Sequence, residues 1–63
     1  MNVRELIELL QEWPDQEATV VIGEGMRLDQ WLFVTGVVGR RIAADPKNPD
    51  VAQPGAEAGV EIV

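Results

Sequence analysis

Four residue types are missing from this 63-residue chain: cysteine, histidine, serine and tyrosine. Without cysteine the chain forms no disulfide and no thiolate metal cluster, and cysteine content does not indicate whether it works in an oxidising or a reducing compartment. The usual nucleophiles and general bases are also missing, which leaves carboxylates, Lys47, Thr19 and Thr35 for covalent or acid–base work. We therefore expect a protein that is not an enzyme and that uses no cofactor and no metal ion.

Long hydrophobic runs are missing as well. The longest apolar-leaning run, residues 31–38, is far too short to cross a bilayer, and glutamates interrupt residues 5–12, where a signal segment would be continuously apolar. We expect a cytoplasmic protein with no membrane contact. A chain this short makes at most one domain and buries only about 60% of its unfolded surface. With no disulfide or metal to add stability, we expect oligomerisation or docking on a partner to supply it.

Positive charge is scarce. Five Lys and Arg residues face 11 acids, for a formal net charge of −6. Residues 1–30 hold seven acids against Arg4 and Arg27, a net of −5, and residues 31–63 hold four acids against three cations, a net of −1. This balance argues against direct binding to nucleic acid, whose affinity comes mainly from cationic contacts with phosphate. It allows binding to a basic protein surface; the competing interpretation is a solvated charged helix face.

The first 22 residues predict a helix followed by a strand. Asn2 is a favoured N-cap, and Glu5 follows at the spacing of a capping box. Pro14 disfavours helical geometry at Trp13, so the helix should end there. The residues Ala18–Ile22 are rich in β-branched side chains and predict a strand. One apolar stripe recurs at helical spacing along the helix and comprises Val3, Leu6, Ile7, Leu10 and Trp13.

The remainder of the chain predicts strands and turns. Residues 31–42 are the longest β candidate, which Gly36 and Gly39 interrupt, so they form either one bent strand or two. Residues 43–58 hold three of the four prolines and predict a loop, and residues 59–63 predict a closing strand. We expect residues 1–63 to form a single α+β domain. One N-terminal helix would pack on a small antiparallel sheet of three to four strands, in the order α-β-β-β.

Both ends of the chain resemble a known class of protein. The sequence reads Val-Arg-Glu-Leu-Ile-Glu-Leu-Leu at 3–10, Asp-Gln-Glu-Ala-Thr-Val-Val-Ile at 15–22 and Gly-Val-Glu-Ile-Val at 59–63. It is similar to small uncharacterised phage and prophage proteins that begin with a V-[KR]-E-L-I-x-x-L helix and continue into an E-V-V-I type strand. The resemblance does not cover the middle of the chain. It implies no catalytic residue and an accessory protein that acts by binding in the host cytoplasm; some small phage proteins of this size inhibit host defence systems.

Seven residues are candidates for binding a partner. The acids at 5, 8, 12 and 15 could face a basic protein surface. The tryptophan at 31 could anchor an interface, and the arginines at 40 and 41 could bind a carboxylate or phosphate. The competing interpretations are a solvated helix face, a core tryptophan, and edge charges that block unwanted strand pairing. These candidates are Glu5, Glu8, Glu12, Asp15, Trp31, Arg40 and Arg41.

Two other polar clusters predict turns rather than sites. Residues 23–25 lack the lysine and the spacing of a phosphate-binding loop. Asp45, Asn48 and Asp50 do not match a calcium-binding loop, and Lys47 lies among them. Taken together, the sequence predicts a small acidic accessory protein of the phage type that acts by protein–protein binding, such as an inhibitor of a host defence protein. The alternative is a structural subunit that forms a homodimer or larger oligomer and has no separate ligand.

Overall fold

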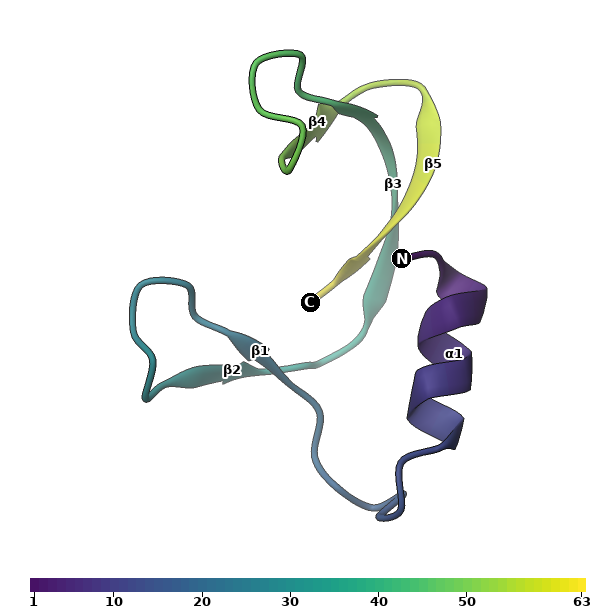
Figure 1. Cartoon of the computed structure of the whole chain (residues 1–63), viewed down its shortest axis with the longest axis vertical. Helices are drawn as coiled ribbons and strands as arrows, with labels where there is room; N and C mark the ends of the chain where they lie inside the picture. The colour runs from purple at the N-terminus through teal and green to yellow at the C-terminus, as the bar shows by residue number, and fades with distance from the viewer.

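In the computed structural model, which describes all 63 residues, one helix is followed by five strands (Figure 1). The strands form two small antiparallel sheets: β1 pairs with β2, and β3 lies between β4 and β5. The predicted α+β class is confirmed, with the strands divided between two sheets rather than joined in one. The elements are α1 (Val3–Gln11), β1 (Val21–Gly23), β2 (Trp31–Phe33), β3 (Val37–Ala44), β4 (Ala52–Pro54) and β5 (Glu57–Ile62).

The start of α1 is capped as predicted. The Oδ1 atom of Asn2 accepts a hydrogen bond from the backbone N–H of Glu5 at 2.8 Å, and the Oε1 atom of Glu5 accepts one from the backbone N–H of Asn2 at 3.4 Å. This capping box satisfies amides that the first helical turn leaves without partners. Both partners are three residues apart, so the helix start depends on local sequence alone.

The end of α1 is held by a side chain from the following turn. The helix ends at Gln11, close to the predicted stop before Pro14. The side-chain amide of Gln16 then donates hydrogen bonds to the carbonyl of Leu10 at 2.9 Å and to that of Trp13 at 2.6 Å. Carbonyls in the last turn of a helix lack helical partners, so Gln16 stabilises the helix end and fixes the path of the chain that leaves it.

The first sheet is a short two-stranded ribbon. Its register pairs Val21 with Phe33 and Gly23 with Trp31. The strand predicted at 18–22 therefore begins later and ends one residue later, because residues 18 and 19 have no strand beside them. Only the carbonyl of Val20 extends the ladder, accepting a hydrogen bond from Val34 at 3.3 Å. A two-stranded ribbon is at best marginally stable alone in water.

The predicted strand over residues 31–42 is two strands. The chain leaves β2 after Phe33 and enters β3 at Val37. At the break, the backbone N–H groups of Thr35 and Gly36 both donate to the carbonyl of Val63, and the N–H of Val63 donates to the carbonyl of Gly36 at 2.9 Å. The backbone beyond β5 thus holds the junction between the two sheets.

The second sheet includes seven of the 16 residues in the predicted loop at 43–58. Strand β3 continues to Ala44, β4 occupies residues 52–54 and β5 begins at Glu57, so the prediction of a loop was wrong for these residues. The loop proper spans residues 45–51. In it, Asp45 Oδ1 accepts a hydrogen bond from the N–H of Lys47 at 2.9 Å, and Asn48 Oδ1 accepts one from Asp50 at 3.2 Å. These are Asx turns, as the composition predicts for this stretch.

A glycine lets the chain cross β3 between β4 and β5. Those two strands lie on opposite sides of β3, so residues 55 and 56 must pass over it. The N–H of Gly55 donates to the carbonyl of Arg41 at 3.2 Å, and a Cβ atom at Gly55 would lie 2.7 Å from the backbone nitrogen of Ala43. Because the obstructing atom belongs to the backbone, a side chain at position 55 could not be accommodated without moving the chain.

The chain has no buried core of its own. None of its 63 residues is buried, and its radius of gyration is 13.8 Å, against about 10.6 Å for a compact domain of this length. Its accessible surface is 5902 Å², about 1,900 Å² more than the surface expected of a compact protein of its mass. The predicted packing of the helix on a sheet is not seen within one chain: Leu6 is half-buried, and the rest of the stripe is exposed.

Candidate interaction surfaces

The β1–β2 ribbon presents an exposed aromatic face. Alternate residues of a strand share a face, so the register places Val21, Gly23, Trp31 and Phe33 together. The side chain of Trp31 is 60% exposed and that of Phe33 is 75% exposed. Gly23 is the residue opposite Trp31, so no side chain reaches across from β1 to cover the indole. We call these four residues the aromatic face; Trp31 is a surface residue of the single chain, as an interface anchor would be.

The acids of α1 lie on the side opposite its apolar stripe. At 100° per residue, Glu5, Glu8 and Glu12 fall within one sector of the helix surface, and all three are exposed. Neither Glu8 nor Glu12 is in an ion pair, since the two pairs in the chain are Arg27–Asp29 and Arg40–Glu61. We call these three residues the acidic side.

Asp15 does not belong to the acidic side. It lies in the turn after the helix, where its Oδ1 atom accepts a hydrogen bond from the backbone N–H of Glu17 at 3.0 Å. This Asx turn gives Asp15 a local structural role. Of the four acids predicted to bind a partner, the structure therefore brings three together and separates the fourth.

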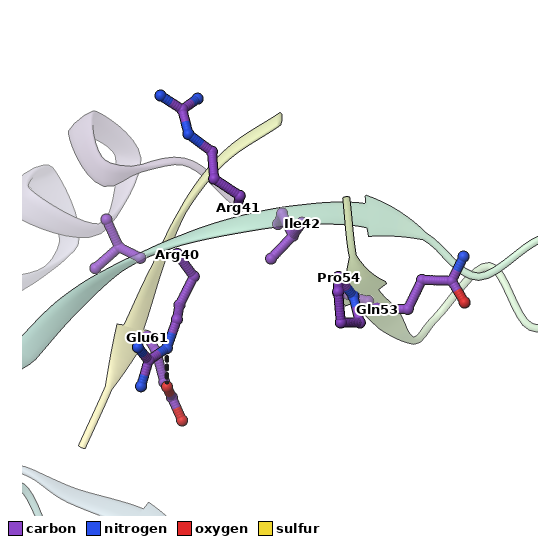
Figure 2. Close-up of a pocket in the computed structure, with 8 residues that line it drawn as sticks. Arg40, Arg41, Ile42, Gln53, Pro54 and Glu61 are labelled. Atoms are coloured by element: carbon purple, nitrogen blue, oxygen red, sulfur yellow. Dashed lines mark hydrogen bonds and ion pairs between the residues drawn. The ribbon is translucent and has the colours of Figure 1, made fainter. Parts of the chain in front are cut away.

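The two arginines point to opposite faces of the second sheet. Figure 2 shows Arg40 extending toward Glu61 and Arg41 extending away on the other side of β3. The Nε atom of Arg40 is 2.7 Å from Oε1 of Glu61, and both side chains are about half exposed. Arg41 makes one long hydrogen bond, from Nη1 to the carbonyl of Ala56 at 3.4 Å. The two guanidinium groups therefore do not converge on one ligand.

The two faces of the β3–β5 ladder differ in polarity and in exposure. One face carries the Arg40–Glu61 pair, Glu57 and the half-buried side chains of Val38 and Ile42. The other face is apolar except at one end, and most of its large side chains are exposed: Val37 is 69% exposed and Val60 is 55% exposed. We call it the open face, and its residues are Val37, Gly39, Arg41, Ala58, Val60 and Ile62.

On the opposite face, a side chain of β3 packs closely across β5. A Cβ atom at Gly59 would lie 2.8 Å from Cδ1 of Ile42, so the isoleucine side chain lies across the glycine of the neighbouring strand. At Gly39, on the open face, a Cβ atom would meet nothing within 4 Å. The chain thus partly covers one face of its own sheet and leaves the open face bare except at the end where residues 55 and 56 cross beside Arg41.

The surface also has concave regions. One, of about 570 Å³, lies between the end of α1 and the approach to β1, where Leu10, Trp13 and Val20 are among its apolar lining residues. Another, of about 460 Å³, lies on the second sheet beside Arg40 and Pro54 (Figure 2). Sequence reasoning missed both: the first depends on how the turn after α1 folds back within residues 10–21, and the second joins residues from three separate strands.

No group of three or more acidic side chains lies close enough to hold a metal ion. No helix is long and apolar enough to cross a membrane. Comparison of the chain with protein-family models, curated proteins and solved structures found no match. The resemblance to small phage proteins therefore stays a prediction, and the surfaces described above are the basis for assigning a function.

Proposed function

We propose that the chain is a small acidic accessory protein of the phage type, which acts in the host cytoplasm by binding protein and not by catalysis. One observation carries the proposal: none of its residues is buried, while large apolar side chains are exposed on the helix and on both sheets. Extensive exposed apolar surface in a small protein marks an interaction site. Inhibition of a host defence protein is the form of this function that the sequence resemblance implies.

Two surfaces support contact with a partner other than a copy of the chain. The aromatic face offers Trp31 and Phe33, and tryptophan is enriched among the residues that contribute most to binding energy. The acidic side offers carboxylates that have no ion-pair partner, which would steer a basic surface toward the helix and raise the rate of association. We therefore assign affinity mainly to the aromatic face and association rate mainly to the acidic side.

Capture from host lysate tests whether a partner exists. Tagged protein should retain one host protein in a fixed ratio, and the Trp31→Ala variant should retain much less of it. The variant tests the aromatic face specifically, because an exposed side chain contributes little to the fold of the single chain. Failure to capture any stoichiometric partner would contradict the proposed function.

Charge reversal tests the acidic side. Changing Glu5, Glu8 and Glu12 to lysine should slow association with the captured partner roughly tenfold or more at low salt, and less at high salt, because exposed charges are screened. A matched control changes Glu17, Glu24 and Asp29 to lysine, which shifts the net charge by the same amount at sites away from the acidic side. Equal slowing in both variants would show that net charge acts, and not the acidic side.

The arginines give a second comparison. Replacing Arg40 and Arg41 with alanine should slow association much less than reversing the acidic side does, since Arg40 is already paired with Glu61. Loss of binding in the arginine variant alone would instead favour a site that grips a carboxylate or phosphate.

The alternative function, a structural subunit, is supported by the open face and the apolar stripe of α1. Both are mostly exposed in the single chain, and both are largely apolar, so contact between the stripe of one copy and the open face of another would remove apolar surface from water. Self-association with no captured host protein would favour this alternative.

A further inference from the structure

We propose that a second copy of the chain completes the core. The apolar stripe of α1 in one copy docks on the open face of the β3–β5 sheet in the other copy, and the reverse contact forms by two-fold symmetry. This inference goes beyond the proposed function, because it requires no host partner.

The exposed area is sufficient for such a dimer. The chain exposes 5902 Å², an excess of about 1,900 Å² over a compact protein of its mass. A standard-size interface buries about 800 Å² on each partner, and obligate homodimers bury more. The excess exposed area of the chain is therefore about twice what a standard-size interface buries on each partner.

The helix and the sheet face match in size and shape. The β3–β5 ladder contains the six residue pairs from Val37–Ile62 to Ile42–Glu57, a length of about 20 Å at the usual rise of a strand. The nine residues of α1 span about 14 Å. Gly39 lies within the ladder with open space above it, so a side chain from a docked helix can enter between Val37 and Val60.

Charge selects the open face over the opposite one. The opposite face carries Glu57 and the Arg40–Glu61 pair. Covering these groups with an apolar helix stripe would remove charges from water at a cost that nothing in the stripe offsets. The open face carries a single charge, Arg41, at the end of the ladder next to the crossing chain. There the aliphatic part of Arg41 can lie against a helix while its guanidinium stays in water.

The path of the chain holds α1 away from its own sheets. Gln16 ties the turn after the helix to the carbonyls of Leu10 and Trp13. The chain passes through this turn at the end of the molecule farthest from β4 before it rises to β1, and α1 stands beside the sheets without covering either (Figure 1). Docking on a second copy buries the stripe without a change in this path, and it leaves both acidic sides of the dimer facing water.

Engineered cysteines test the contact, because the natural chain contains none to interfere. One preparation carries Leu10→Cys, on the stripe, and another carries Val60→Cys, on the open face. The two are mixed in denaturant, refolded together and oxidised. We expect a covalent heterodimer as the main product on a non-reducing gel.

Matched controls locate the contact. Glu8→Cys replaces Leu10→Cys to test the opposite side of the same helix, and Glu61→Cys replaces Val60→Cys to test the next residue, which lies on the opposite face of the sheet. Each control pair should cross-link at least tenfold less. Equal cross-linking of Leu10→Cys to Glu61→Cys would overturn the proposal.

Three further results would also overturn it. A chain with both Leu10→Cys and Val60→Cys that closes on itself at high dilution, without forming a dimer, would show that the helix docks on its own sheet. For the unaltered chain, an equal mixture of ¹³C-labelled and unlabelled protein should show nuclear Overhauser effects between the methyl groups of Leu10 and Val60 across copies. Their absence, or sedimentation as a monomer at NMR concentrations, would overturn the proposal. None of these experiments on the purified chain contains a host protein, so a negative result in them is distinguishable from failure of the proposed function.

Discussion

Replacing Gly55 with alanine should destabilise the second sheet strongly. A Cβ atom at this position would lie 2.7 Å from the backbone nitrogen of Ala43 and 2.7 Å from the carbonyl carbon of Ile42. Non-bonded carbon atoms are at optimal separation about 3.5–4.0 Å apart. The crossing chain must therefore rise by roughly 1 Å above β3, which would stretch the 3.2 Å hydrogen bond from Gly55 to Arg41 beyond bonding distance.

The size of the effect follows from three terms. Forcing an extra carbon into a tight contact costs about 1–3 kcal/mol, and loss of a backbone hydrogen bond costs about 1 kcal/mol. Alanine recovers about 0.4–1 kcal/mol by restricting the unfolded chain. The net loss is about 1–3.5 kcal/mol, which lowers the melting temperature of a domain this small by about 5–25 °C.

Thermal unfolding followed by circular dichroism measures this change, at one fixed protein concentration because association raises apparent stability. Gly59→Ala is the matched control: its Cβ atom would meet the flexible end of the Ile42 side chain at 2.8 Å, so a rotamer change can relieve the contact. Its loss should be under about 1 kcal/mol. If Gly55→Ala has the same melting temperature as the wild-type chain, the chain does not cross β3 in close contact with its backbone at residue 55.

Three other predictions concern smaller or more selective effects. Asn2→Ala should cost about 1 kcal/mol and reduce helical circular dichroism, because it removes the cap of α1; an unchanged spectrum would show that the cap is dispensable. Arg40→Ala should cost under about 1 kcal/mol, since its ion pair with Glu61 is half exposed, and the cost should shrink at high salt. Leu10→Asp should shift sedimentation toward the monomer and Glu8→Lys should not; equal shifts would mean that the stripe is not the contact.

The helix was predictable because its determinants are local. The capping box joins residues three positions apart, and the stop before Pro14 acts on the residue next to it. Each signal is complete within one or two turns, so no knowledge of the rest of the fold is needed.

The strands were less predictable because pairing decides where they begin and end. Strand β4 has three residues, includes Pro54 and shows no apolar alternation, so nothing in its own sequence distinguishes it from a loop. It exists because the end of β3 lies beside it, and a proline is tolerated there because β4 is an edge strand. Pairing also explains why only the last two residues of the strand predicted at 18–22 form β1: residues 18 and 19 have no strand beside them.

The candidate surfaces were predictable in composition but not in grouping. Helical periodicity separates the stripe from the acidic side, and both are where the sequence predicts them. The sequence does not say what covers the stripe, because covering depends on contacts with distant elements or other chains. It also does not show that β1 places Gly23 opposite Trp31, since that pairing depends on the register of the ribbon.

The central position of β3 also sets an order for folding. Its pairing with β4 begins at Ala44–Ala52, whereas its pairing with β5 begins at Ile42–Glu57, which closes a loop about twice as long. Closing the longer loop costs about 0.6 kcal/mol more conformational entropy. The β3–β4 hairpin should therefore form first, and β5 should add to it after the chain has crossed at Gly55. Changes in the 45–51 turn then act mainly on the rate of folding, and changes in β5 act mainly on the rate of unfolding.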